Sequence, residues 1–310
     1  MPLRRKPFQG LTSPEDIAVL SKTPFDRLSW IVENKAGLYG RFTRPKKKGG
    51  VRVITPPCKE LRVIQYRIKE YIDQRVRWPL YLHGGIEGRS VITNATPHTG
   101  QRVVANFDIE GFFPSTSEDR VTKLLKDGGM ASEAAGLTAA LCCFESRLPQ
   151  GAPTSTCLAN LAFTPIDDRL LRIIRRRRFV YTRFVDDLTI SGGDELRSFK
   201  GTVKQEIQRG GYTTSLDVLL GRHQRQVVTG IVVNDRMRPS AEFIQQLKGD
   251  VRDCWPDEAG AETVAANYGL TIAQLRNRLF GRISHLKQFD GRLARKIRGL
   301  MAKIVWRGTC

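Results

Sequence analysis

The sequence of 310 residues contains no apolar run that approaches the ~20 residues needed to span a membrane. Its first residues (MPLRRK) are basic and lack the apolar core of a secretory signal peptide. The six cysteines form no CxxC pair and no regular framework, so we expect reduced thiols in a cytoplasmic protein. No internal repeat or low-complexity linker divides the chain. The sequence therefore predicts neither a membrane-spanning, nor a disulfide-rich, nor a repeat protein.

Acidic residues are few relative to basic ones. The chain has 51 Lys and Arg against 31 Asp and Glu, which gives a formal net charge of +20. Such an excess attracts a polyanion through long-range electrostatics and counterion release, and nucleic acid is the first candidate. An acidic membrane surface is the alternative, but without an apolar span we expect no membrane partner. The composition, 40% hydrophobic and 26% charged, is that of an ordinary globular protein.

Helical periodicity alternates with short apolar runs that favour strands. Helices are predicted over about 14–22, 59–77, 117–126, 131–145, 153–175 and 195–209. Strands are predicted at 51–54, after a basic hairpin tip, and at 103–109, 179–184, 188–191, 212–218 and 227–234. Because hairpins and helices are mixed, we predict an α+β fold rather than a doubly wound parallel sheet.

The last forty residues differ from the rest of the chain in composition. Residues 271–310 contain ten Lys and Arg and a single acid, Asp290. Apolar residues recur there at intervals of three and four, which predicts one amphipathic helix. These apolar residues are Leu286, Phe289, Leu293, Ile297, Leu300 and Ile304. We expect the opposite, cationic face to bind nucleic acid, although a merely solubilising face is the simpler alternative.

Three aspartates form the strongest chemical signal. Asp108 ends a predicted buried strand, and Asp186 and Asp187 lie at the tip of a predicted hairpin. Neighbouring carboxylates raise one another's pKa unless a cation neutralises them. Mg²⁺ prefers carboxylate oxygens, and two such ions hold the attacking and leaving oxygens in phosphoryl transfer. The alternative is a structural role, because aspartate is a favoured turn residue.

The segments around these aspartates occur in a characteristic order. Residues 106–115 (NFDIEGFFPS), 148–155 (LPQGAPTS) and 184–187 (FVDD) together resemble the catalytic motifs of reverse transcriptases. More narrowly, 94–98 (NATPH) and 228–230 (VTG) resemble elements of bacterial retron reverse transcriptases. Residues 44–52 (RPKKKGGVR) resemble the fingers motif, and the resemblance covers roughly 37–290. Phe184 replaces the usual tyrosine, and Thr156 replaces a common proline.

The resemblance implies a right-hand polymerase fold with fingers, palm and thumb. It implies an N-terminal helical extension over 1–36, interleaved fingers and palm over 37–236, and a basic helical thumb over 237–310. The implied reaction is RNA-directed DNA synthesis, in which a 3′-hydroxyl attacks the α-phosphorus of a dNTP.

Roles for individual residues follow from the same resemblance. Asp108 and Asp186 would bridge two Mg²⁺ ions, Asp187 would support them, and the Ile109 carbonyl is a further possible ligand. Phe113 would be the steric gate that rejects a 2′-hydroxyl, although a core aromatic is the alternative. The implied nucleotide-binding residues are Lys47, Arg52, Phe112, Phe113 and Gln150, where Arg52 and a lysine of 46–48 hold the triphosphate. The predicted nucleic-acid-binding residues are Asn94, His98, Arg292, Arg295, Lys296 and Arg298; a structural role for His98 is the alternative.

A retron enzyme would use a cognate noncoding RNA as both template and primer. Its 2′-hydroxyl would start a branched RNA–DNA product, multicopy single-stranded DNA (msDNA), in the bacterial cytoplasm. Such enzymes act in anti-phage defence with a separate effector protein, and no effector domain is visible in this sequence. A group II intron-like or diversity-generating reverse transcriptase is one alternative, although no endonuclease or maturase domain follows the thumb. A catalytically silent RNA-binding scaffold is another, and the intact aspartates argue against it.

Overall fold

The computed structural model describes residues 6–45, 49–255 and 258–306 of the chain. The chain divides into two compact units, with the boundary between Gln224 and Arg225. The predicted helical extension lies in the first unit together with residues 37–224 of the predicted fingers and palm. The last residues of the predicted palm, 225–236, and the predicted thumb lie in the second unit. The assignment of fingers, palm and thumb stays a prediction.

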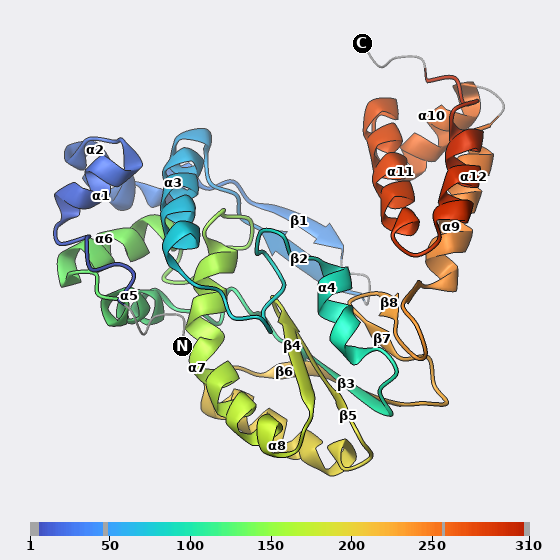
Figure 1. The fold of residues 1–310 in the computed structure, drawn as a ribbon. Coiled ribbons are helices and arrows are strands. Elements are labelled where there is room, and N and C mark those ends of the chain that lie inside the picture. Colours follow the sequence, from blue (N-terminus) through green and yellow to red (C-terminus); the bar gives the residue numbers. More distant parts are fainter. Residues whose placement is uncertain (1–5, 46–48, 256–257, 307–310) are drawn as a thin grey trace. The chain divides into compact units, whose positions relative to one another are not determined.

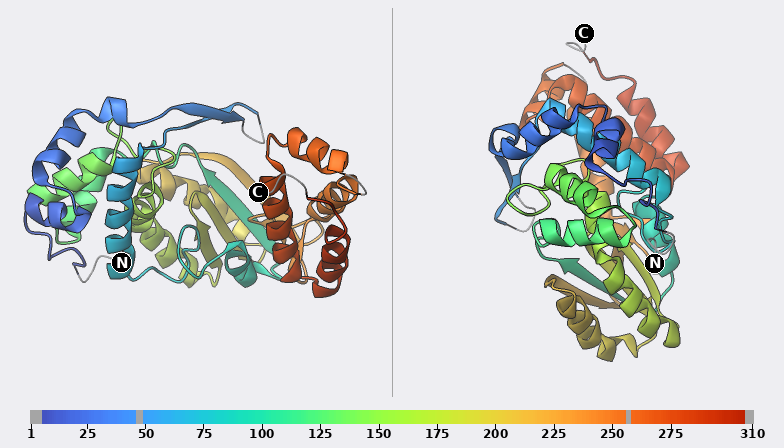
Figure 2. Two further views of the ribbon diagram at one scale, coloured as in Figure 1. Left: turned by 90° about the horizontal axis from the view of Figure 1, so that it is seen from above. Right: turned by 90° about the vertical axis from the view of Figure 1, so that its left-hand side faces the viewer.

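Helices and one hairpin make up part of the first unit (Figure 1). The helices α1 (Pro14–Ser21), α2 (Phe25–Glu33), α3 (Lys59–Arg75), α5 (Glu118–Asp127) and α6 (Ser132–Cys142) pack against one another. Strands β1 (Phe42–Pro45) and β2 (Val51–Ile54) pair antiparallel, as the sequence predicted. The hairpin extends away from α1 and α2 in the left view of Figure 2. Its basic tip, 46–48, lies outside the described residues, and so does the predicted ligand Lys47.

The rest of this unit is built on a four-stranded antiparallel sheet. Its order is β4 (Val180–Phe184), β5 (Asp187–Gly192), β3 (Val103–Ile109) and β6 (Thr214–Gly221). Helices α7 (Ser155–Arg176) and α8 (Leu196–Arg209) pack against it and against each other. The antiparallel sheet with packed helices confirms the predicted α+β class, and the predicted helices and strands of this unit are present.

The edge strand β4 has a partner outside the sheet. The Arg183 N–H donates to the Tyr81 carbonyl at 2.8 Å, and the His83 N–H donates to the Arg183 carbonyl at 2.8 Å. Leu82 and Arg183 thereby form a parallel bridge. Helix α4 (Val91–Ala95) and the 3₁₀ turn η2 (Thr96–His98) follow this segment, and α4 contacts β4.

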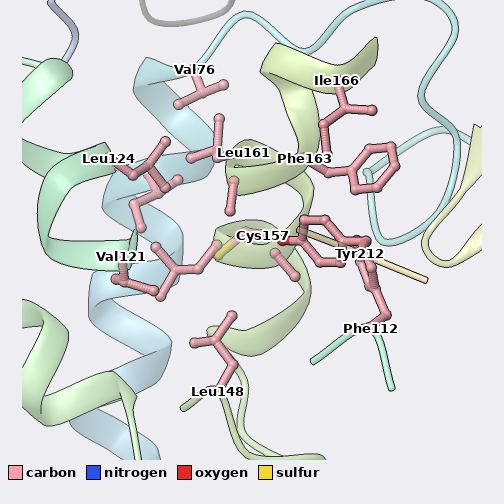
Figure 3. Packing of buried hydrophobic residues seen from close by; sticks show 14 of the residues in the cluster. Val76, Phe112, Val121, Leu124, Leu148, Cys157, Leu161, Phe163, Ile166 and Tyr212 are labelled. Atoms are coloured by element: carbon pink, nitrogen blue, oxygen red, sulfur yellow. The ribbon is translucent and has the colours of Figure 1, made fainter. Parts of the chain in front are cut away.

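The core of the first unit is continuous around α7 (Figure 3). Phe163 of α7 lies 5.1 Å, centroid to centroid, from the ring of Tyr212. Phe112, which follows β3, packs on both rings, at 5.8 and 5.9 Å. Cys157 and Leu161 are buried on the same helix. This packing anchors the segment after β3 to α7, the helix that follows the LPQG turn.

The second unit differs from the sequence prediction in two places. The strand predicted over 227–234 is instead a tight hairpin, because Thr229 and Gly230 both adopt positive φ and reverse the chain. Its strands are β7 (Val227–Val228) and β8 (Ile231–Val232), followed by β9 (Arg238–Pro239). The helices of this unit are α9 (Ala241–Asp253), α10 (Glu258–Asn267), α11 (Ile272–Lys287) and α12 (Gly291–Met301).

The prediction of a single amphipathic helix from residue 286 onward was wrong. The carboxylate of Asp290 accepts a hydrogen bond from the Leu293 N–H at 2.9 Å, so Asp290 caps α12 and separates it from α11. The apolar spacing continues across this turn because α11 and α12 pack on each other and bury a common core. Leu286 therefore belongs to α11, and Leu300 is exposed.

Candidate active site

The three aspartates meet at one end of the sheet. Asp108 of β3 lies opposite Asp187 of β5 in the strand register. Val185 and Asp186 form the two-residue connection between β4 and β5, where Phe184 pairs with Asp187. The Ile109 N–H donates to the Asp186 carbonyl at 3.1 Å, which ties the connection to the end of β3. Residues about eighty positions apart in sequence are thus joined by the backbone alone.

A cavity of about 400 Å³ opens beside the carboxylates of Asp108 and Asp186, and Asp187 is not among the residues that line it. It brings together five side chains that the resemblance assigned to the active site: Arg52, Asp108, Phe113, Gln150 and Asp186. They come from β2, β3, the segment after β3, the turn before α7 and the β4–β5 connection. The Thr55 N–H donates to the Gln150 carbonyl at 2.7 Å, which joins the hairpin to the LPQG turn. The Ile109 and Phe112 positions also line this cavity.

The electrostatics of the cavity favour a cation. Burial raises the pKa of the Asp186 carboxyl, and the neighbouring charge of Asp108 raises it further, against the opposing effect of Arg52. A cation between the two carboxylates relieves both effects. Mg²⁺ usually takes one or two protein carboxylates and completes its octahedron with water and substrate phosphates. The two carboxylates fit that pattern, although the described residues contain no group of three or more His, Cys, Asp or Glu that could hold a metal by themselves.

The two phenylalanines after β3 have different surroundings. Phe112 is only 3% exposed and its ring packs in the core, although the residue also lines the cavity, and its predicted contact with the nucleotide stays a prediction. Phe113 is partly exposed and lines both the cavity with the carboxylates and a neighbouring cavity of about 350 Å³. The ring centroids of the two residues are 5.8 Å apart, so Phe112 supports Phe113 from the core side.

Asn94 and His98 are fully buried, and we therefore correct the prediction that they bind nucleic acid. The His98 Nδ1 lies 2.7 Å from the Ser191 hydroxyl and its Nε2 lies 2.8 Å from the Thr182 hydroxyl. The imidazole thus bridges β4 and β5, which is the structural alternative considered from sequence. Burial lowers the pKa of His98 to about 3, with a smaller contribution from His83.

The His98 imidazole predicts a pH dependence of stability. Its pKa in the folded protein lies below its ordinary value, so the unfolded chain binds the extra proton and stability falls as the pH drops below about 6.5. The free energy of unfolding should fall by up to about 1.4 kcal/mol per pH unit in this range. His98→Gln retains a donor and an acceptor but does not titrate, so urea denaturation at pH 7, 6 and 5 should give a shallower slope. Part of the pH dependence should remain in this variant, because burial also lowers the pKa of His83. The same pH dependence in His98→Gln and the unsubstituted protein would show that His98 does not cause it.

The four basic residues predicted to bind nucleic acid all lie on the exposed side of α12. Arg292, Arg295, Lys296 and Arg298 are exposed, whereas Ala294, Ile297 and Met301 of the same helix are buried. Their spacing places the cationic side chains opposite the core, so this surface is available to a polyanion. Contact with nucleic acid stays a prediction.

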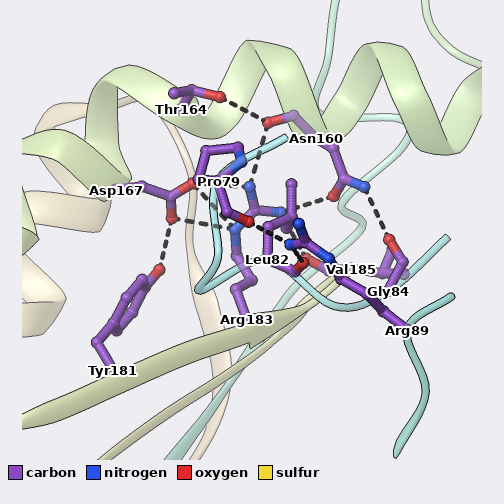
Figure 4. Close-up of polar contacts among 10 residues, drawn as sticks. All are labelled: Pro79, Leu82, Gly84, Arg89, Asn160, Thr164, Asp167, Tyr181, Arg183 and Val185. Atoms are coloured by element: carbon purple, nitrogen blue, oxygen red, sulfur yellow. Dashed lines mark hydrogen bonds and ion pairs between the residues drawn. The ribbon is translucent and has the colours of Figure 1, made fainter. Parts of the chain in front are cut away.

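Sequence reasoning missed a buried ion pair next to the site. The Arg183 guanidinium donates to both carboxylate oxygens of Asp167, through Nε at 3.0 Å and Nη2 at 2.7 Å (Figure 4). Both side chains are 0% exposed. The Tyr181 hydroxyl also donates to Asp167, at 2.5 Å. The available signal was weak: Asn160 and Asp167 are polar residues seven positions apart in a mostly apolar stretch of α7.

The comparisons with known proteins agree with this geometry. The family described as reverse transcriptase (RNA-dependent DNA polymerase) matches residues 44–216, more than half of the chain. That match includes the aspartates and every motif that lines the cavity. A solved telomerase structure from Candida albicans, in complex with a fragment of telomeric RNA, covers 88% of this chain and 63% of its own at 10% identity. Its TM-score of 0.45 is too low to support an argument.

Within the reverse transcriptases, several curated relatives of this chain are retron enzymes. The retron Mx65 reverse transcriptase of Myxococcus xanthus is 31% identical, over 84% of this chain and 63% of the relative. The retron Mx162 enzyme of the same organism is 29% identical, over 82% and 61%. The retron Ec86 reverse transcriptase of Escherichia coli is 30% identical, over 65% and 62%. This chain thus spans less than two thirds of the length of each relative. The chain belongs to the reverse transcriptase family, and both the predicted right-hand polymerase fold and the predicted similarity to the retron type are confirmed.

Proposed function

We propose that this protein is an RNA-directed DNA polymerase that extends a primer along an RNA template. The observation that carries the proposal is the cavity in which Asp108 and Asp186 lie together with Arg52, Phe113 and Gln150. This set supplies what nucleotidyl transfer needs: anionic groups for cations, a cation for the triphosphate and a ring beside the sugar. Family membership supports the reaction class.

Each side chain has a distinct part in the proposed reaction. Asp108 and Asp186 would hold two Mg²⁺ ions, which when bound polarise the α-phosphate and stabilise the attacking and leaving oxygens. Arg52 would neutralise charge that develops on the triphosphate as pyrophosphate leaves. Phe113 would limit the space at the sugar C2′, and Gln150 would orient the incoming nucleotide. Asp187 and the Ile109 carbonyl are proposed to support the same ions.

We further propose that the enzyme is a retron reverse transcriptase acting on its own noncoding RNA. The support is that the curated relatives named above are retron enzymes. In this proposal an RNA 2′-hydroxyl primes synthesis, the product is msDNA, and a separate effector protein completes an anti-phage system. Among the described residues, none of the helices is both long and apolar enough to cross a bilayer.

A primer-extension assay tests the first proposal. Purified protein, an RNA template with an annealed DNA primer, dNTPs and Mg²⁺ should yield extended product, and chelation of the metal should abolish it. No extension with any divalent cation would contradict the proposed activity.

Sequencing the nucleic acid that copurifies with the protein tests the second proposal. A single structured RNA covalently joined to DNA through a 2′–5′ bond is expected, and unlinked, unrelated RNAs would exclude the retron assignment.

Phe113→Val should weaken discrimination between dNTPs and rNTPs. The smaller side chain opens space where a 2′-hydroxyl would lie, so the ratio of kcat/KM for dNTP over rNTP should fall by roughly 10- to 100-fold while dNTP use persists. Phe113→Tyr keeps the ring and is the matched control, for which we expect little change. An unchanged ratio in the valine variant would assign Phe113 to packing alone.

Replacing Arg292, Arg295, Lys296 and Arg298 together with alanine should weaken binding of the cognate RNA. If these residues contact phosphates only, affinity falls equally for all RNAs, and the salt slope drops by roughly one for each lost contact. A retron enzyme must select its own RNA, which is read through shape, loops and 2′-hydroxyls. We therefore expect a larger loss for the cognate RNA than for an unrelated hairpin of equal length. Binding is measured at two salt concentrations, with circular dichroism to confirm that the helix folds; equal losses would indicate a nonspecific contact.

A further inference from the structure

The residue before Asp186 has an unfavourable backbone conformation. Val185 is the first residue of the two-residue β4–β5 connection, and its φ of 59° lies in the left-handed region. A β-branched residue rarely adopts this conformation, because its side chain crowds the backbone, and glycine is the usual residue at this position of a hairpin. Such a conformation persists only where the surrounding structure imposes it. The question is what imposes it here.

The buried Arg183 holds the connection from one side. Its Nη1 donates to the Val185 carbonyl at 2.9 Å and to the Asn160 side-chain oxygen at 2.8 Å (Figure 4). Its Nη2 also donates to the Asn160 backbone carbonyl at 3.1 Å, and the remaining donors engage Asp167. The guanidinium is therefore fixed on α7 and cannot follow the connection if the connection moves.

Gly84 closes the other side. A Cβ at this position would lie 2.5 Å from the Val185 nitrogen and 2.5 Å from its Cγ2, so only glycine fits against the connection. The Asn160 side-chain nitrogen donates to the Gly84 carbonyl at 2.9 Å. Asn160 thus holds both Arg183 and the glycine that faces Val185.

The two carbonyls of the connection are therefore held independently. Arg183 binds the carbonyl of Val185, and the Ile109 N–H binds the carbonyl of Asp186. These bonds leave little freedom for the backbone that carries the Asp186 carboxylate, which lines the cavity with Asp108. An ion pair that served stability alone would not need a donor on this carbonyl.

We propose that Arg183, fixed by Asp167 and Asn160, is a positioning residue that imposes the left-handed conformation of Val185 and so aims Asp186 at the metal position. The inference rests on the proposed polymerase function, and it concerns a network that contacts no substrate. It predicts that the effect of losing Arg183 depends on the residue at position 185, because glycine adopts positive φ without a restraint.

The test is a comparison of two variants of the full chain. Arg183→Met with Asp167→Leu removes both buried charges, and the second variant adds Val185→Gly. In the first variant we expect kcat in primer extension to fall by about 10- to 100-fold, the size expected from a ~1 Å misplacement, while KM for dNTP changes little. Titration of the protein alone with Mn²⁺, followed by electron paramagnetic resonance, should show weaker binding. Adding Val185→Gly should recover a substantial part of both losses.

The matched control is Arg169→Met. It removes a different ion pair of the same helix, Arg169 with Glu206 at 2.9 Å, and should leave kcat and Mn²⁺ affinity unchanged. If the paired variant does not fold, Asn160→Ala is used instead. It keeps the ion pair but removes the side-chain contacts to Arg183 and Gly84. We again expect kcat to fall while KM for dNTP changes little.

Two results would overturn the proposal. One is a folded variant with the kcat and Mn²⁺ affinity of the unsubstituted protein. The other is a loss of kcat and Mn²⁺ affinity that is equally large with and without Val185→Gly, which would indicate a purely structural ion pair. Failure of the proposed polymerase function can be told apart from failure of this inference. In the first case the unsubstituted protein would not extend a primer, and the Mn²⁺ affinity of the variants would still test whether Arg183 positions Asp186.

Discussion

Asp186→Asn should reduce kcat for primer extension by about three orders of magnitude or more. Asparagine has the size and the turn preference of aspartate but lacks its charge, so the two-residue connection should still form. The variant loses the carboxylate that shares the cavity with Asp108. Stabilisation of the transition state by two metal ions lowers the activation free energy by at least several kcal/mol, and each ~1.4 kcal/mol corresponds to a factor of ten in rate.

Single-turnover extension at saturating dNTP measures this effect, and circular dichroism and RNA binding confirm the fold. Asp194→Asn is the matched control, because Asp194 is an exposed acid whose partners are Arg102 and Arg197. Its removal should leave extension unchanged. A well-folded Asp186→Asn protein with near-normal extension would show that Asp186 is a turn residue and that the site lies elsewhere.

Asp167→Leu should be among the most destabilising single substitutions in this protein. It leaves the Arg183 guanidinium buried, with 0% exposure, and without its anionic partner. Breaking a buried ion pair from one side costs about 3–5 kcal/mol, because the remaining charge stays desolvated. For a unit of this size the loss corresponds to a drop in Tm of roughly 10 °C.

The paired variant Arg183→Met with Asp167→Leu should recover most of that stability. Replacing both charges with apolar side chains of similar volume removes the uncompensated charge and is often neutral or stabilising. Thermal unfolding of the single and paired variants, followed by circular dichroism, measures the difference. Equal Tm values for the two would contradict the assignment, because the penalty would then not come from the unpaired charge.

Local patterns account for most of what the sequence predicted correctly. The strand that carries Asp108, the hairpin that carries Asp186 and the turn at Gln150 each follow from apolar periodicity and turn residues within a few positions. The ordered motifs then identified the residues that line one cavity, although nothing in their spacing required them to meet. The resemblance to a known family supplied that information.

The features that sequence missed depend on contacts between distant segments. Whether His98 faces RNA or bridges two strands depends on Thr182 and Ser191, more than eighty residues later. Arg183 reads as one more surface cation in a basic chain until α7 places Asp167 against it. The break at Asp290 was missed because α11 and α12 bury a common core, so the apolar spacing continues through the turn.

The pairing of segment 81–83 with β4 has a consequence for how this protein behaves at high concentration. An edge strand with open N–H and C=O groups is a template for strand addition between molecules, and such addition leads to aggregation. At Arg183 these groups are already bonded to Tyr81 and His83. The segment therefore shields the sheet edge from other copies at the position where the chain also carries its buried guanidinium. The same few residues that lie next to the β4–β5 connection thus leave the edge strand no open backbone groups at Arg183.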